Sequence, residues 1–151
     1  MKLDRQAAGT FCSLIRLMQG NPHLRIENEP FMPLTIERID ENLRLSAVRM
    51  DVYSLCHYYI QHGDLMQDPE MCFLVSVNGT GDPGPDTLEI IPFMFQQANI
   101  GAYEESMVRR GDTIRMVDPL MQQEQTVFAN QWLHNIQRMG FPSENRTLIR
   151  L

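Results

Sequence analysis

Apolar residues recur at intervals of three and four positions near both ends of the chain, and this spacing predicts two amphipathic helices. The first extends over about residues 4–18, where Asp4 can cap the first turn. The second extends over about residues 118–139, with Pro119 at its first position and Gly140 just beyond its end. Each helix is predicted to pack one apolar stripe against the rest of the protein.

A third, shorter helix is predicted in the middle of the chain, behind Asp51. Its apolar residues follow the intervals i, i+3, i+4, i+7 and i+8, namely Val52, Leu55, Cys56, Tyr59 and Ile60. Gly63 then ends this helix in a position that favours glycine, and residues 64–69 are expected to form an acidic loop.

Alternation of apolar and polar residues predicts strands elsewhere. The alternating segments are residues 34–39, 43–47, 70–77, 87–96 and 113–117. A turn at 40–42 joins the first two into a hairpin, and a Gly- and Pro-rich loop at 78–86 joins the next two. The apolar phase slips beside Pro92, which predicts a bulge or an edge strand at that position.

These elements indicate an α+β fold. We expect a small antiparallel sheet built from two hairpins, packed with an N-terminal helix, a short middle helix and a long C-terminal helix. The 151 residues are an ordinary length for one domain and too few for two, so the whole range 1–151 is taken as a single domain. No element is predicted in the tail at 141–151.

The ionisable residues are distributed unevenly. The chain has 13 basic and 19 acidic residues, a formal net charge of −6, and no Lys or Arg from Met50 to Val108. Binding to a nucleic-acid backbone requires a positive surface, so the charge argues against direct binding of that kind. It favours a partner protein with a basic surface, which an acidic region attracts over long range.

The three cysteines, Cys12, Cys56 and Cys72, lie among apolar neighbours and show no CxxC spacing. We interpret them as small buried hydrophobic residues rather than as a disulfide framework or a zinc site. No stretch approaches the ~20 apolar residues that span a bilayer, and the first residues lack the pattern of a secretory signal. We therefore expect a cytoplasmic protein without membrane contact and without a cofactor.

The densest polar segment is residues 57–70, which contains two histidines and three carboxylates. Asp64, Asp68 and Glu70 are residue types that bind divalent metal ions in hydrolases, so one interpretation is a nuclease-like metal site with His57 assisting. The absence of a lysine after Glu70 argues against a nuclease. The other interpretation is that local hydrogen bonds hold a helix end, a turn and a strand start, with no metal.

The same segment carries a family resemblance. HYYIQHGDLMQDPEM, residues 57–71, resembles a motif of an uncharacterised small domain found in phage, plasmid and conjugative-element proteins of gut Firmicutes. PFMFQQANIGAYEE, residues 92–105, is also similar to that domain, in which it combines a strand, a polar pair and an aromatic residue near an acidic one. The likeness covers about residues 33–105. It implies a mobile-element origin and a bacterial cytoplasm, and no activity.

Three functions follow from these observations. The first, which we prefer, is a non-catalytic accessory protein that binds a host or element protein through an acidic face, for example as an inhibitor of a defence nuclease. Its candidate residues are Asp64, Asp68, Glu70, Glu104 and Glu105, with a polar group of His57, His62, Gln96 and Tyr103. The second is the metal-dependent hydrolase described above. The third is a structural module that forms a homodimer through a sheet edge.

Overall fold

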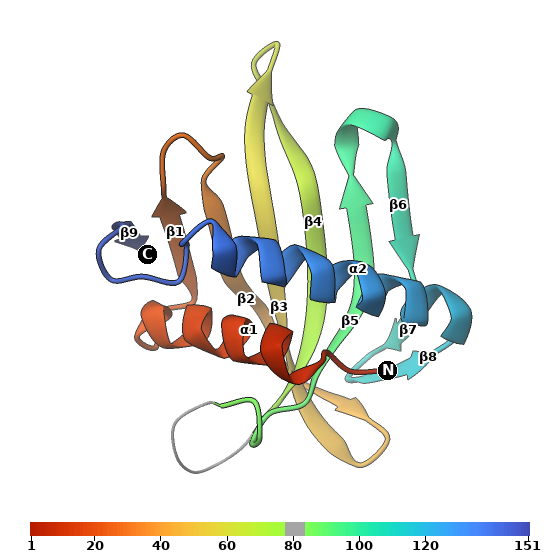
Figure 1. The fold of residues 1–151 in the computed structure, drawn as a ribbon. Helices are drawn as coiled ribbons and strands as arrows, with labels where there is room; N and C mark the ends of the chain where they lie inside the picture. Colours follow the sequence, from red (N-terminus) through yellow and green to blue (C-terminus); the bar gives the residue numbers. More distant parts are fainter. Residues whose placement is uncertain (78–83) are drawn as a thin grey trace.

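Figure 1 shows the computed structural model, which describes residues 1–77 and 84–151. Two helices lie across one face of a large sheet, which has nine strands among the described residues. The elements in chain order are α1 (Arg5–Met18), β1 (His23–Glu27), β2 (Leu34–Leu45), β3 (Val48–Gln61), β4 (Asp64–Ser76), β5 (Ile90–Gln97), η1 (Ala98–Ile100), β6 (Ala102–Glu105), β7 (Met107–Arg110), β8 (Thr113–Met116), α2 (Pro119–Arg138) and β9 (Thr147–Arg150). The α+β fold class is thus confirmed, with a sheet much larger than two hairpins. Most of the predicted loop 78–86 lies outside the described residues.

Both terminal helices are confirmed close to their predicted bounds. The Asp4 side chain accepts a hydrogen bond from the Ala7 amide at 2.8 Å, and the Asp118 side chain accepts one from the Met121 amide at 3.0 Å. These caps satisfy amides that have no partner within the helix. Because the caps and the apolar stripes are local in sequence, both helices could be predicted without knowledge of the sheet.

The strands form a mainly antiparallel sheet in the order β6-β5-β4-β3-β2-β1-β9. The β7–β8 hairpin leaves this order, because β8 pairs in parallel with β2 through Arg44–Thr113 and Leu45–Ile114. Ser106 joins β6 to β7, and its amide donates to the Phe93 carbonyl at 2.9 Å. One end of the sheet, from β2 to β5, is therefore closed into a small barrel by β7 and β8.

The sheet has a hydrophobic core on each face. The larger core lies between the sheet and the two helices, and its largest fully buried side chains include Phe11, Phe73 and Phe141. The smaller core fills the closed end on the helix-free face, and it consists of Leu43, Met50, Val52, Cys72, Leu74, Met94, Met107 and Ile114. Alternate residues of β3, β4 and β5 therefore serve two different cores.

The predicted middle helix is wrong, because its residues form most of β3. Strand β3 pairs with β2 over residues 48–57 on one side and with β4 over residues 50–61 on the other. Residues 52–57 are all buried, since the strand is covered on both faces. A strand that is buried on both faces has apolar residues at most positions, and some of these are necessarily three and four positions apart. The helical periodicity of this segment is therefore a by-product of its burial.

Two predicted loops also belong to strands. The expected turn at 40–42 is an irregularity inside β2, where the register with β3 shifts around Asp40 and Asn42 has a positive φ of 61°. The chain turns instead between β2 and β3, at residues 46–47. The expected acidic loop at 64–69 is the first half of β4, paired with the end of β3. Long-range pairing therefore overrides these local turn signals.

The bulge at Pro92 is confirmed. Phe73 pairs with Pro92 and the neighbouring Cys72 pairs with Met94, so Phe93 is the extra residue of β5. The alternative of an edge strand is wrong, because β6 pairs with the other side of β5.

The tail contains β9, which was not predicted and pairs with β1. Neither described helix has the length and apolar character needed to cross a membrane.

Candidate functional site

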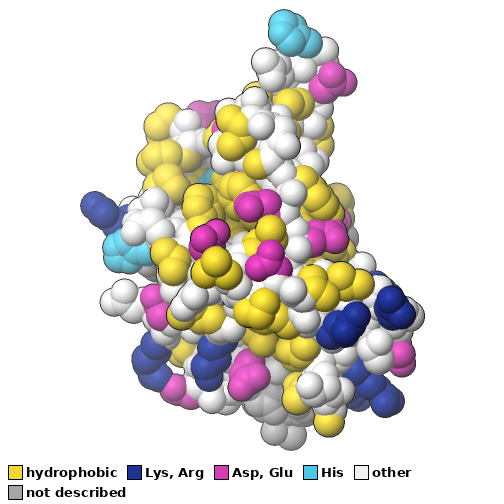
Figure 2. Space-filling view, turned by 90° about the vertical axis from the view of Figure 1, so that its right-hand side faces the viewer, with side chains coloured by type: hydrophobic (Ala, Val, Ile, Leu, Met, Phe, Trp, Pro, Cys, Tyr) yellow, Lys and Arg dark blue, Asp and Glu magenta, His cyan; other side chains and the backbone are white. Residues whose placement is uncertain are grey.

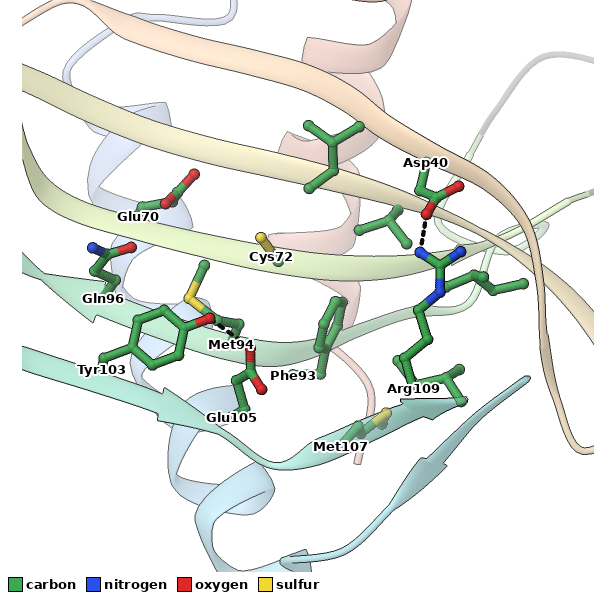
Figure 3. A pocket seen from close by; sticks show the side chains of 14 residues that line it. Asp40, Glu70, Cys72, Phe93, Met94, Gln96, Tyr103, Glu105, Met107 and Arg109 are labelled. Carbon is green, nitrogen blue, oxygen red and sulfur yellow. Dashed lines mark hydrogen bonds and ion pairs between the residues drawn. The ribbon is translucent and has the colours of Figure 1, made fainter. Parts of the chain in front are cut away.

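The candidate site is a pocket of about 410 Å³ at the mouth of the closed end, on the helix-free face. Its floor is formed by β3, β4 and β5, and its walls by β2 on one side and by β6 and β7 on the other. Figure 3 shows acidic and amide side chains at one end of the pocket, the Asp40–Arg109 pair at the other, and Cys72, Met94 and Phe93 between them. The pocket therefore combines an apolar centre with two polar ends.

Cross-strand pairing positions the polar end. Glu70 on β4 pairs with Gln96 on β5, and Gln96 pairs with Tyr103 on β6, so these three residues form one row across the sheet. The next row contains Cys72, Met94 and Glu105 in the same way. Residues two apart on a strand share a face, so both rows face the pocket. The site thus depends on the register of three strands.

Both carboxylates of this end are held by neighbouring hydroxyl groups. The Ser54 hydroxyl donates to Oε2 of Glu70 at 2.6 Å, and the Tyr103 hydroxyl donates to Oε1 of Glu105. The second bond, together with partial burial, raises the pKa of Tyr103 to about 12. The other oxygen of each carboxylate has no protein partner among the described residues. Each group therefore presents an acceptor to the pocket.

The opposite end of the pocket is closed by an ion pair. Arg109 on β7 donates to Oδ2 of Asp40 on β2, and its Nε donates to the Gly111 carbonyl at 2.8 Å. The hydrogen bond from Arg109 lowers the pKa of Asp40 below its usual range, and a bond from the Glu41 amide adds to this. Because Arg109 is already paired, it does not neutralise the carboxylates at the other end.

The cysteine beneath the pocket is a structural residue. The Cys72 side chain is buried in the small core, and desolvation raises the pKa of its thiol, with further contributions from the carboxylates of Glu70 and Glu105. Desolvation likewise raises the pKa of Cys56 to about 12. A thiol needs its thiolate form to act as a nucleophile or a metal ligand. The prediction that the cysteines are small buried hydrophobic residues is therefore confirmed.

The acidic residues proposed from the sequence do not share one face. Glu70 and Glu105 line the pocket. Glu104 lies on the opposite face of β6, beside α2, where its carbonyl accepts from Gln125 at 3.1 Å. Asp64 is at the exposed tip of the β3–β4 hairpin, and Oδ1 of Asp68 accepts from Gln97 at 2.9 Å. The acidic face that the structure brings together is therefore smaller than expected.

A register shift separates the three carboxylates of the metal-site interpretation. Cys56 pairs with Glu70 but Tyr58 pairs with Gln67, so β4 has an extra residue between these pairs. Gln67 and Glu70 therefore share a face, and alternation from Gln67 places Asp64 on the other. Among residues 1–77 and 84–151, no group of three or more His, Cys, Asp or Glu side chains is arranged to hold a metal ion.

The polar group proposed from the sequence is divided in the same way. Gln96 and Tyr103 are cross-strand partners in the pocket. His57 lies on the helix-covered face, where its ring contacts Trp132 and Phe141 at centroid distances of 5.8 and 5.4 Å. Its burial lowers its pKa. His62 is exposed in the β3–β4 turn with a φ of 52°.

Two residues that shape the pocket could not be found from the sequence: Ser54, which holds Glu70, and Arg109 in the pocket lining. Ser54 was hidden because its segment has helical periodicity, and Arg109 because its partner Asp40 is 69 positions away. For β5, the alternating pattern of the strand places Met94 and Gln96 on one face, and this indicates that both line the pocket. Figure 2 shows the molecule from the side of β6, the right-hand side of Figure 1, with acidic side chains among hydrophobic ones across its middle and most Lys and Arg side chains below.

Comparisons with known proteins identify the chain only at the level of its family. No curated protein and no solved structure matches it. A family model described as "Domain of unknown function (DUF6908)" matches residues 9–142, which extends from the middle of α1 beyond the end of α2. This agrees with the expectation of an uncharacterised small domain, and the match extends beyond both ends of residues 33–105. The chain belongs to the family of this domain of unknown function.

Proposed function

We propose that the protein is a non-catalytic binding protein that holds a basic surface of a partner protein against its helix-free face. The observation that carries this proposal is the pair of carboxylates, Glu70 and Glu105, at one end of an open apolar pocket. The nearest cation lining this pocket, Arg109, is paired with Asp40. The negative charge at that end is thus available to a partner.

The charge distribution along the chain supports the same proposal. Residues 50–108 contain no Lys or Arg, and they supply β4, β5, β6 and the part of β3 that follows Arg49. The sheet surface around the pocket therefore has few internal cations to compete with those of a partner. Long-range attraction of this kind speeds association and selects basic partners.

The biological setting is part of the proposal. The resemblance of residues 57–71 to a domain of mobile-element proteins supports an accessory protein of a phage or plasmid that works in a bacterial cytoplasm. A nuclease of a host defence system has a basic groove for its nucleic acid, and an acidic protein can occupy such a groove. We therefore propose inhibition of a defence nuclease as the specific form of this function.

Selection from a library of random peptides displayed on phage tests the binding function. We expect the immobilised protein to enrich peptides that contain Arg or Lys beside apolar residues, and their binding to weaken as the salt concentration rises. The double variant Glu70→Gln/Glu105→Gln should lose this enrichment. The matched control Asp64→Asn/Glu104→Gln removes the same charge away from the pocket and should keep it. Enrichment of acidic or uncharged peptides would contradict the proposal.

A homodimer formed through a sheet edge is the second candidate. Strand β9 pairs with β1 on one side only. Ile149 within it and Leu151 just after it are 39% and 73% exposed. Unpaired edges with exposed apolar side chains favour pairing with another chain. Light scattering should then show a doubled mass that Ile149→Lys abolishes and Val127→Lys, on the exposed face of α2, does not. The monomer mass at all concentrations would exclude this candidate.

A further inference from the structure

We propose that the pocket receives one arginine side chain of the partner, with the guanidinium group between Glu70 and Glu105 and the aliphatic stem on the apolar floor. This inference rests on the proposed function and specifies which partner residue the site recognises. The occupant is an arginine within a protein segment rather than a free small molecule.

The acceptors of the pocket suit a group that donates in several directions. Glu70 and Glu105 belong to different rows and lie on strands separated by β5, so their unpaired oxygens approach the pocket from two sides. Two strand spacings are about 10 Å, which a point-like ammonium group cannot bridge as well as a planar guanidinium with five N–H donors. The side-chain oxygen of Gln96, in the row of Glu70, provides a further acceptor between them.

The apolar part of the pocket suits the stem of an arginine. Met94 and Cys72 form the floor next to the carboxylates, and each is only 6% exposed, so the floor is firmly packed from below. Long basic side chains place their methylene groups on apolar surface and keep the charged group at a polar site. A pocket of about 410 Å³ has room for this side chain and for neighbouring residues of the partner.

The aromatic ring of Tyr103 favours arginine over lysine. The Tyr103 side chain is 59% exposed at the rim, and its hydroxyl is held by Glu105, so the ring is fixed in position while one side remains open. A guanidinium group stacks on such a ring and forms charge-assisted hydrogen bonds with carboxylates at the same time. At the far end, the Asp40–Arg109 pair limits how far the arginine can extend.

Binding of short peptides to the full chain, followed by NMR of its backbone amides, tests this inference. The probes are acetylated, amidated peptides that differ only in one central residue, which is arginine, lysine or citrulline. We expect the arginine peptide to bind about tenfold more tightly than the lysine peptide and the uncharged citrulline peptide to show no saturable binding. The shifts caused by the arginine peptide should concentrate at Gln96, Tyr103 and Glu105.

Variants of the pocket complete the test. Glu70→Gln/Glu105→Gln should weaken the arginine peptide about tenfold or more, and Asp64→Asn/Glu104→Gln by no more than about twofold. Tyr103→Ala should weaken it several-fold, whereas Tyr103→Phe, which keeps the ring, should stay within about threefold. Amide spectra of each variant establish that it is folded.

The outcomes separate this inference from the proposed function. If the lysine peptide binds as tightly as the arginine peptide, with shifts at the pocket and loss of binding in Glu70→Gln/Glu105→Gln, the arginine site is wrong while the binding function stands. If the shifts lie elsewhere, or the two double variants behave alike, both the arginine site and the proposed function fail. If no basic peptide binds, the proposed function fails as well. If free arginine amide binds as tightly as the peptide, the site recognises a small guanidinium compound and the inference of a protein segment is overturned.

Discussion

The two faces of the sheet are built from the same strands but differ in how they are covered. On β4, Phe73 is fully buried beneath α1, where its ring lies 4.8 Å from that of Phe11. One position earlier, Cys72 belongs to the small core beneath an open pocket. The helix-covered face has a continuous core, whereas the helix-free face is closed only where β7 and β8 cross it. On the helix-free face, an apolar part of the sheet surface therefore stays accessible at the pocket.

This comparison explains where binding chemistry can reside. A carboxylate within the larger core, between the sheet and the helices, would be buried without a partner, at a high cost in free energy. On the helix-free face, Glu70 and Glu105 border the apolar floor and still reach solvent. The partly covered face therefore supplies both apolar contact area and charge, a combination typical of binding sites.

The largest expected effect comes from truncating the core of the helix-covered face. Phe73→Ala should lower the free energy of unfolding by about 3–5 kcal/mol, because it leaves a cavity between the helices and the sheet. Met94→Ala on the pocket floor should cost about 2 kcal/mol or less, because solvent can enter the adjoining pocket. Urea unfolding of both variants measures the difference, and equal losses would contradict the contrast between the faces.

A smaller effect is expected where the two faces are joined. Gln125 of α2 is buried, accepts from the Ser106 hydroxyl at 2.6 Å and donates to the Glu104 carbonyl at 3.1 Å. Gln125→Leu should lower the free energy of unfolding by about 1–3 kcal/mol, because buried polar groups lose their partners. In a double-mutant cycle, Ser106→Ala should add less to Gln125→Leu than it costs alone. If the losses of the two single variants simply add in the double variant, the hydrogen bond between Ser106 and Gln125 does not stabilise the junction of the two faces.

The pH dependence of stability tests the burial of His57 on the helix-covered face. Desolvation lowers the pKa of His57 in the folded protein, so the unfolded chain binds the proton more readily. The free energy of unfolding should therefore fall as the pH drops from 7 through the ordinary histidine range near 6.5, by at most about 1.4 kcal/mol per pH unit. His57→Gln should flatten this slope between pH 7 and 5.5. His62→Gln, in the exposed turn, should leave it unchanged.

The smallest effect is expected at the ion pair of the helix-free face. Asp40 and Arg109 are 33% and 49% exposed in their side chains, so solvent screens their attraction. Asp40→Asn should change the free energy of unfolding by less than about 1 kcal/mol, and less still at high salt. Thermal unfolding at two salt concentrations checks this. A loss comparable to that of Phe73→Ala would mean that the pair, rather than the apolar core, holds the barrel end closed.

Local signals account for what could be predicted. Caps, Pro119 and apolar stripes specified both helices, and the alternation through Phe73 and Val75 specified the second half of β4. The β3 segment was misjudged because burial on both faces erases the alternation that identifies a strand. Strand β9 was missed because a four-residue edge strand depends on pairing with β1, which is more than a hundred positions away.

The candidate site was predicted in part for the same reason. Glu70, Gln96, Tyr103 and Glu105 were singled out from two separate segments, and the sheet brings these four together. Asp64, Asp68, Glu104, His57 and His62 came from the same segments, and strand alternation and the shift in β4 place them elsewhere. Neighbours in sequence on a strand face opposite sides, so sequence proximity alone is a poor guide to a shared site.

The sequence by itself determined the two helices, the burial of the cysteines and the part of β4 from Glu70 onward, because each depends on residues within one or two turns or pleats. Only the tertiary structure decided that β3 is a strand, that β8 joins β2, and that Glu70 and Glu105 border one pocket. These features depend on hydrogen bonds between segments far apart in the chain, whose register no local pattern specifies. The charge was visible in the sequence, and the fold selected which part of it faces a partner.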